Sequence, residues 1–488
     1  MGIIIDILGD ISLSQADFNK FKPEITAEKI NSVIGTADYR IADLESPFCL
    51  EESVVPIEKS GPNLKMQKNS IPFFEKLQVD GYALANNHLG DFGEEGVINT
   101  IRVLEELKKD YVGSAKEYAY VYCPLRKIIK GMKISFISVC ENEFGIARDD
   151  RIGAAGFDKE RMKKTLAEES QWADFKLIIF HGGTEHYPYP APDEKCRYHD
   201  LADMGADAVI GMHSHCPKGF EIYHGVPIIY SVGNFFFPKS FDTPFEAWKF
   251  GYIARFVLQI GSQAEVEIIP YGFDIYGCDF FAVDCSRFHS YIQSLSETIQ
   301  NDKHLKDLYS AWSMISGKRY FERMCKSVAS EVDGAGLCAV KNLFCCEAHN
   351  ELLKTYLTIL YNNDEMKYYS FIEEIKDNMS PMSTIASAGN DRITYENIDV
   401  AIWGVGEKAE ILFDSLRIKE KKIIFIDSDV LKQGKTFLGR DIISPEEAIE
   451  KLHMADFYIC TSSTAEREIK AMLKNNGIKE NHMNWKEN

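Results

Sequence analysis

The chain has 488 residues and a formal net charge of -19, so its length suits two or three domains with sizeable apolar cores. Such an acidic chain lacks the basic surface that sequence-independent nucleic-acid binding requires, and we expect no nucleic acid among its partners. Its twelve cysteines are scattered without C-x-x-C spacing, and no secretory pattern or apolar run of roughly 20 residues is present, which predicts a cytoplasmic protein without a transmembrane segment.

Acidic side chains follow the first two predicted strands. Residues 3–8 form a short apolar run that predicts a buried strand, and Asp10 comes just after it. The apolar segment that starts at residue 39 leads to Asp43 and Glu45, which strand alternation places on one face. Open α/β sheets place ligand-binding groups just beyond the carboxyl ends of their strands. These carboxylates are therefore candidate ligands, although Asp10 has the alternative interpretation of a helix or turn cap.

Amide and imidazole groups follow later strands in the same way. Asn87 and His88 end one predicted strand, before a glycine turn and a helix from about residue 94. The Asn87 amide oxygen is a candidate metal ligand and His88 a candidate proton donor, whereas a structural alternative has Asn87 capping the helix. The apolar run 177–180 then delivers His181 into a second glycine turn.

His213 and His215 lie on a turn between the apolar runs 208–210 and 227–232. Alternating imidazoles on such a turn suit Zn, Fe or Mn ligation, and the alternative is a pair of solvent-facing loop histidines. Because the four earlier strand ends also carry ligand-type groups, the sequence favours a shared metal site. Residues 251–258 and 265–269 then alternate as a closing antiparallel pair.

The rest of the chain divides into a helical part and a second α/β part. Helical patterns such as 343–360 follow residue 284, and Cys346 with His349 is interpreted as packing rather than as a metal pair. Residues 380–389 are typical of a linker. We expect domains over 1–280, 281–385 and 390–488.

Near the C-terminus, a glycine turn separates two predicted strands. Gly404, Gly406 and Asp427 follow a shortened dinucleotide-binding fingerprint. The glycines would admit a phosphate and Asp427 a ribose hydroxyl of a bound nucleotide. The alternative is a scaffold or oligomerisation domain that keeps the glycines for the turn. The fold class expected for this part is a Rossmann-like α/β domain.

The first 275 residues or so resemble the calcineurin-like metallophosphoesterases. They more closely resemble the bacterial capsule-synthesis branch, the CapA or poly-γ-glutamate synthesis proteins. The resemblance rests on segments 44–47, 85–93, 181–185, 205–215 and 230–235. It implies an α/β fold with a sandwich of two mixed sheets flanked by helices. The C-terminal part is similar, more loosely, to small Rossmann-type domains of carbohydrate-modifying enzymes.

The resemblance also implies roles for the candidate residues. In those roles one divalent ion is held by Asp10 and His215, and a second is held by Asn87, His181 and His213. Glu45, or else Asp43, bridges the two ions. His88 is the general acid, and Glu185 orients an imidazole. Ser12 stands where the superfamily has a histidine ligand, and Glu45 where it has an aspartate. These departures leave open a weak first ion or a site with a single ion.

The sequence therefore predicts a metal-dependent hydrolase, using Mn, Zn or Fe, that acts in capsule, poly-γ-glutamate or cell-surface polysaccharide synthesis or modification. Activated hydroxide would attack a phosphoester or related bond. A small anionic or activated sugar or phosphate substrate suits a chain of charge -19 better than a finished anionic polymer. Capsule-synthesis machinery is an expected partner. The alternative is a non-catalytic metal- or nucleotide-binding assembly or regulatory factor.

Overall fold

The computed structural model forms two compact units, one of residues 1–239 with 247–381 and one of residues 240–246 with 382–488. It describes residues 2–488 except 60, 149–150, 241–245, 284, 330–333, 379–397, 407, 410–411, 414–422, 430–431, 434–435, 438–439, 453–454, 462, 480–482 and 485–488. The predicted linker 380–389 lies outside the described residues. Among the residues described, no helix has the length and apolar character needed to cross a membrane.

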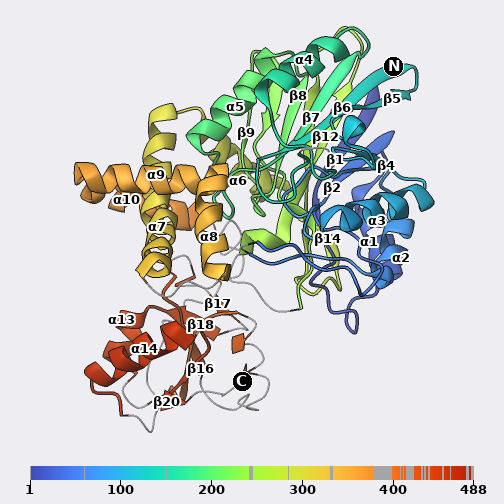
Figure 1. The fold of residues 1–488 in the computed structure, drawn as a ribbon. Helices are drawn as coiled ribbons and strands as arrows, with labels where there is room; N and C mark the ends of the chain where they lie inside the picture. The colour runs from blue at the N-terminus through green and yellow to red at the C-terminus, as the bar shows by residue number, and fades with distance from the viewer. Residues whose placement is uncertain are drawn as a thin grey trace. The chain divides into compact units, whose positions relative to one another are not determined.

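The first unit contains two mixed sheets that pack face to face (Figure 1). The first sheet has the order β14-β13-β12-β1-β2-β3-β4, and β11 pairs with the end of β1. Its strands are β1 (Ile3–Ile11), β2 (Tyr39–Leu44), β3 (Gly81–Ala83), β4 (Asp110–Val112), β11 (Asn234–Phe236), β12 (Phe250–Leu258), β13 (Glu265–Phe273) and β14 (Phe280–Ala282). Strands β1 to β4 run parallel, whereas β12 to β14 add antiparallel, as the alternation of the closing pair predicted.

The second sheet has the order β5-β6-β7-β8-β10-β9, with β6, β7, β8 and β10 parallel. Its strands are β5 (Leu125–Ile129), β6 (Met132–Cys140), β7 (Phe175–His181), β8 (Ala208–Met212), β9 (Phe220–Tyr223) and β10 (Val226–Ile229). Strand β7 is buried along its whole length, as expected for a parallel strand covered on both faces. Between the sheets, the ring of Tyr39 stacks on Phe136 with centroids 5.2 Å apart.

Helices cover the outer faces of the sandwich (Figure 1). They are α1 (Pro23–Ile34), α2 (Ile71–Lys76) and α3 (Gly93–Glu106) beside the first sheet, and α4 (Lys159–Glu169) and α5 (Pro192–Asp203) beside the second. Helix α3 begins close to the predicted start, and its N-cap residue is Phe92. The interpretation of Asn87 as the cap of this helix is therefore wrong.

The sandwich brings the carboxyl ends of β1, β2, β3, β7 and β8 together, because these strands run parallel within their sheets. Strand β1 is longer than its apolar run predicted and includes Asp10, where a register shift marks a bulge against both neighbouring strands. A Cβ added at Gly9 would lie 1.8 Å from the Gly233 carbonyl oxygen. The approach of these two segments therefore requires glycine beside Asp10.

The helical part belongs to the same compact unit as the sandwich. It comprises α6 (Cys285–Ile299), α7 (Asp302–Ala329), α8 (Gly334–Cys345), α9 (Glu347–Asn362) and α10 (Glu365–Asn378). The helical pattern predicted over 343–360 is divided between α8 and α9, because Cys346 has extended backbone and separates the two helices. The apolar pattern continues through this break, and so the sequence alone conceals it.

The second unit is a smaller α/β domain with the sheet order β17-β18-β16-β15-β19-β20. It contains β15 (Val400–Trp403), β16 (Ile423–Ile426), β17 (Thr436–Phe437), β18 (Arg440–Ile443), α13 (Pro445–Lys451), β19 (Asp456–Ile459), α14 (Ser463–Asn475) and β20 (Met483–Asn484). The five strands from β18 to β20 are parallel and follow the 3-2-1-4-5 order of a Rossmann sheet. The Rossmann-like fold is thus confirmed, and much of the helix predicted after the glycine turn lies outside the described residues.

Candidate metal centre

The candidate ligands converge where the strands of the two sheets end. Three overlapping groups have ligand atoms within 4.8 Å of one another and could each hold a metal ion: Glu45 with His181 and His213, Asp10 with Asp43 and His181, and Asp10 with Glu45 and His215. All of these side chains are buried. The alternative of solvent-facing loop histidines at 213 and 215 is therefore wrong.

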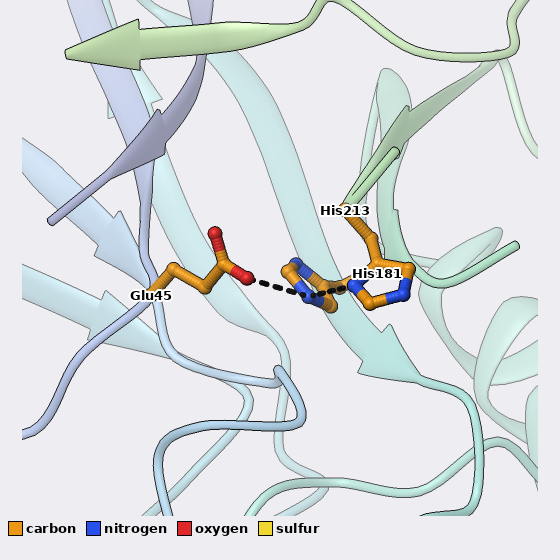
Figure 2. Close-up of side chains that lie close together, drawn as sticks. All are labelled: Glu45, His181 and His213. Carbon is orange, nitrogen blue, oxygen red and sulfur yellow. Dashed lines mark hydrogen bonds and ion pairs between the residues drawn. The ribbon is translucent and has the colours of Figure 1, made fainter. Parts of the chain in front are cut away.

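Glu45 faces the ring of His181, which lies between Glu45 and His213 (Figure 2). Its Oε1 is 3.7 Å from His181 Nε2 and 3.7 Å from His215 Nε2. Neither oxygen of this buried carboxylate has a hydrogen-bond partner among the described residues. An unsatisfied buried carboxylate is costly, and a bound cation is the partner that would satisfy it.

His181, at the end of β7, contacts members of both sheets. Its Nδ1 lies 3.3 Å from Asp43 Oδ2, while its Nε2 lies 3.0 Å from Asn87 Oδ1 and 3.1 Å from His213 Nδ1. Asn86 donates to the other Asp43 oxygen over 3.1 Å. Asp43 thus orients the His181 imidazole in the way that a carboxylate behind a metal ligand does.

The turn that carries the two later histidines has an unusual backbone. His213 and His215 have φ values of +84° and +54°, a region that residues other than glycine seldom occupy and that is enriched at functional sites. The His213 backbone N–H donates to Asp10 Oδ2 over 3.1 Å, and His215 Nδ1 lies 2.9 Å from Asn234 Oδ1. Register pairing of β11 with β1 places Asn234 beside Asp10. Tertiary contacts therefore hold this turn in place.

His88 lies at the edge of the ligand cluster, with its Nε2 4.0 Å from Glu45 Oε1. Its Nδ1 lies 2.7 Å from Asp91 Oδ2 and 3.1 Å from Lys59 Nζ. Lys59 also forms an ion pair with Asp91. These contacts engage Nδ1, so Nε2 is the nitrogen that faces the centre.

Burial sets the protonation of the site. It raises the pKa of the Asp10, Asp43 and Glu45 carboxyls well above their ordinary values. It lowers the pKa of the His181, His213 and His215 imidazoles well below theirs. The imidazoles are consequently neutral near pH 7, the form in which histidine binds metal ions.

Ser12 and Glu185 are not members of the three ligand groups. Ser12 is buried and its Oγ lies 2.5 Å from Ser46 Oγ and 2.7 Å from Ser14 Oγ, which satisfies the hydroxyl within a serine cluster. The Glu185 side chain is 48% exposed and its Oε1 lies 3.9 Å from His213 Nε2. That separation exceeds a hydrogen bond, and its orienting role stays a prediction.

The donor set fits one or two divalent ions. It combines neutral imidazoles, an amide oxygen and carboxylates, the ligand types preferred by Zn, Mn and Fe. Glu45 belongs to two of the three groups, one with His213 and one with His215. The group with His215 lacks a histidine from position 12 because a serine stands there.

Sequence reasoning missed the residues that support the ligands from behind. Asp91 was part of a recognised segment, but no pattern indicated that it would hold His88 together with Lys59. Asn234 belongs to the segment 230–235, but its contact with His215 depends on the pairing of β11 with β1.

The glycine turn of the second unit is a separate feature. A Cβ at Gly404, where φ is +101°, would lie 2.6 Å from the Cys460 carbonyl oxygen, whereas Gly406 has open space around it. Asp427 accepts hydrogen bonds from the Val405 N–H over 3.0 Å and from Lys432 Nζ over 3.1 Å. The carboxylate predicted to hold a ribose therefore also fixes the turn.

Two mixed sheets packed face to face, with carboxylates, an amide and imidazoles at their strand ends, define a metallophosphoesterase-like sandwich. Residues 5–239 match the model of the family described as bacterial capsule synthesis protein PGA_cap. This part of the chain is similar to that family. Residues 396–484 match a model described as C2185-like, N-terminal.

Individual proteins show the same similarity. Capsule biosynthesis protein CapA of Bacillus anthracis is 22% identical over 279 residues, which cover 55% of this chain and 67% of that protein. PGA biosynthesis protein CapA of Bacillus subtilis is 22% identical over 334 residues, 65% of this chain and 83% of that protein. Among solved structures, a 5'-nucleotidase precursor from Thermus thermophilus is similar, with 12% identity, a TM-score of 0.33 and 55% of each chain covered.

Proposed function

We propose that this protein is a divalent-metal-dependent hydrolase that cleaves a phosphoester or related bond during synthesis or modification of a capsule, poly-γ-glutamate or another cell-surface polymer. The similarity to the capsule-synthesis family and to the two CapA proteins supports the biological setting. The buried Glu45 carboxylate, without a hydrogen-bond partner and shared between two histidine groups, carries the chemical part. Capsule-synthesis machinery is the proposed partner.

Each residue has a proposed role. Asp10 and His215 would hold one ion, Asn87, His181 and His213 would hold the other, and Glu45 would be shared. When bound, the ions would supply polarisation of a phosphoryl oxygen and a lowered pKa of bound water. His88 donates a proton from Nε2 to the leaving oxygen, because Asp91 and Lys59 engage its Nδ1. The substrate is a small anionic or activated sugar or phosphate compound.

The test is hydrolysis of phosphomonoesters, phosphodiesters and nucleotide sugars by purified protein that has been stripped and reloaded with Mn²⁺ or Zn²⁺. We expect metal-dependent turnover that His213→Ala abolishes and that His224→Asn leaves unchanged. His224 is the matched control, because its side chain is 72% exposed and contacts Asp203 instead of the site. Equal turnover by His213→Ala and the unaltered protein would refute the assignment.

A second candidate function is a non-catalytic metal- or nucleotide-binding assembly or regulatory factor. Ser12 favours it, because its hydroxyl is satisfied by Ser46 and Ser14 and gives the His215 group no imidazole. If the protein has this second function, we expect a nucleotide to bind at Gly404, Gly406 and Asp427. Calorimetric titration with nucleotides tests it, and binding heat that persists in Gly406→Trp would exclude the turn as the site.

Two further expectations stay predictions. The division into domains at 1–280, 281–385 and 390–488 can be tested by limited proteolysis.

A cytoplasmic location was predicted from the scattered cysteines, and the eleven cysteines whose side chains the structure describes are free thiols. Fractionation of cells that produce the protein would test the location.

A further inference from the structure

A second cluster of ligand-type side chains lies outside the candidate metal centre. Glu141 and Glu143 follow the end of β6, and Cys346 lies between α8 and α9. Their ligand atoms all lie within 4.8 Å of one another. The Cys346 thiol donates to Glu143 Oε1 over 3.0 Å. The sequence predicted packing rather than a metal pair for Cys346 and His349. In the structure, His349 Nδ1 faces the Asn342 amide 3.4 Å away, and the Cys346 thiol faces Glu143.

One carboxylate oxygen of this cluster has no partner. Glu141 is 5% exposed and Cys346 is 1% exposed. Glu141 Oε1 accepts from Arg197 over 2.8 Å, whereas Glu141 Oε2 is buried without a hydrogen-bond partner among the described residues. A buried carboxylate oxygen without a donor indicates a missing cation or water.

The charge balance favours a cation over water. Arg197 offsets one carboxylate of the cluster, and it also pairs with Glu347. A divalent cation would offset the second carboxylate and a Cys346 thiolate. Cys346 is the N-cap residue of the 16-residue helix α9. Burial and the neighbouring carboxylates raise the pKa of its thiol, so a metal ion has to displace the thiol proton on binding.

We propose that Cys346, Glu143 and Glu141 form a second metal site, which takes a thiophilic divalent ion such as zinc and links α9 to the end of β6. Thiolate ligation selects zinc over magnesium or calcium. Binding forms a metal–sulfur bond and releases the thiol proton to solvent. The candidate metal centre contains no sulfur ligand, so the two sites have different spectroscopic signatures.

The test is titration of the full-length, metal-stripped protein with Cd²⁺, followed by thiolate-to-metal charge-transfer absorption in the ultraviolet. We expect Cys346→Ser to lose about one equivalent of this absorption per chain. Cys345→Ser is the matched control, since Cys345 is the adjacent but exposed thiol, and it should keep the absorption. His213→Ala should also keep it, which separates this site from the proposed hydrolytic one.

Glu143→Gln provides a second variant that leaves every thiol in place. We expect its Cd²⁺ affinity at the thiolate site to fall by more than about tenfold. Circular dichroism checks that each variant is folded. If Cys346→Ser does not fold, the Cd²⁺ affinity of Glu143→Gln tests the proposal. Charge-transfer absorption of equal amplitude in folded Cys346→Ser, or unchanged affinity in Glu143→Gln, would overturn the proposal.

Discussion

Replacing Glu45 with glutamine should stabilise the metal-free protein and remove its stabilisation by metal. Both Glu45 oxygens are buried and have no hydrogen-bond partner among the residues that the structure describes. A buried polar group without a partner costs about 1–3 kcal/mol, more when it is charged. Glutamine keeps the shape and removes the charge. We therefore expect the free energy of unfolding of the metal-free variant to rise by about 1–3 kcal/mol at pH 8.

The stability that Glu45→Gln gains over the metal-free unaltered protein should depend on pH. Burial raises the pKa of Glu45 above its ordinary value, so the folded state binds more protons than the unfolded state between those two values. Metal-free wild-type stability consequently falls as pH rises above the ordinary glutamate pKa. Glutamine has no such contribution, and the advantage of the variant should grow from pH 5 toward pH 8.

Added metal should make the unaltered protein more stable than Glu45→Gln. An ion at one hundred times its Kd stabilises a protein by about 2.7 kcal/mol, and Glu45→Gln should gain little of this. The assay is denaturant unfolding with chelator or with Mn²⁺. Glu194→Gln is the matched control. Glu194 is also buried, but its Oε1 lies 3.1 Å from Lys218 Nζ. Removing the Glu194 charge should lower the free energy of unfolding by about 3–5 kcal/mol. Destabilisation of metal-free protein by Glu45→Gln would refute the reasoning.

Three further predictions concern the same centre. His88→Gln should lower metal-dependent turnover by about 10²–10⁴-fold while metal content measured by elemental analysis stays unchanged, as expected for a proton donor; lost metal would instead make His88 a ligand. Asn234→Ala should weaken metal binding by about 10–100-fold, because Asn234 orients His215, and an unchanged Kd in calorimetric titration would contradict this. Metal binding should release protons and tighten as pH rises through neutrality, because burial raises the pKa of the site carboxyls; binding heats that are equal in buffers of different ionisation enthalpy would argue against it.

The ligand cluster was largely accessible from the sequence. Each member follows an apolar run, and parallel strands bring such positions to one edge of a sheet. Asp10, Glu45, His181, His213 and His215 were predicted from this rule and lie together. Their roles in binding and catalysis stay proposals.

The supporting contacts could not be predicted because they depend on tertiary structure. Lys59 reaches His88 and Asp91 from a segment without regular secondary structure. Asn234 meets His215 only because β11 pairs with β1. The break at Cys346 interrupts an apolar pattern that remains helical on both sides. In each case local propensity carries no signal for a contact across the fold.

The pairing of β1 has a consequence for the order in which the protein can fold. Residues 5–7 of β1 pair on one side with β2 and on the other with residues 254–256 of β12. During synthesis, β1 therefore has an unpaired apolar edge until β12 leaves the ribosome. Contacts this distant in sequence slow folding, and an open edge is an aggregation hazard. Nascent chains that end before residue 250 should therefore depend on chaperones more than chains that extend past β13.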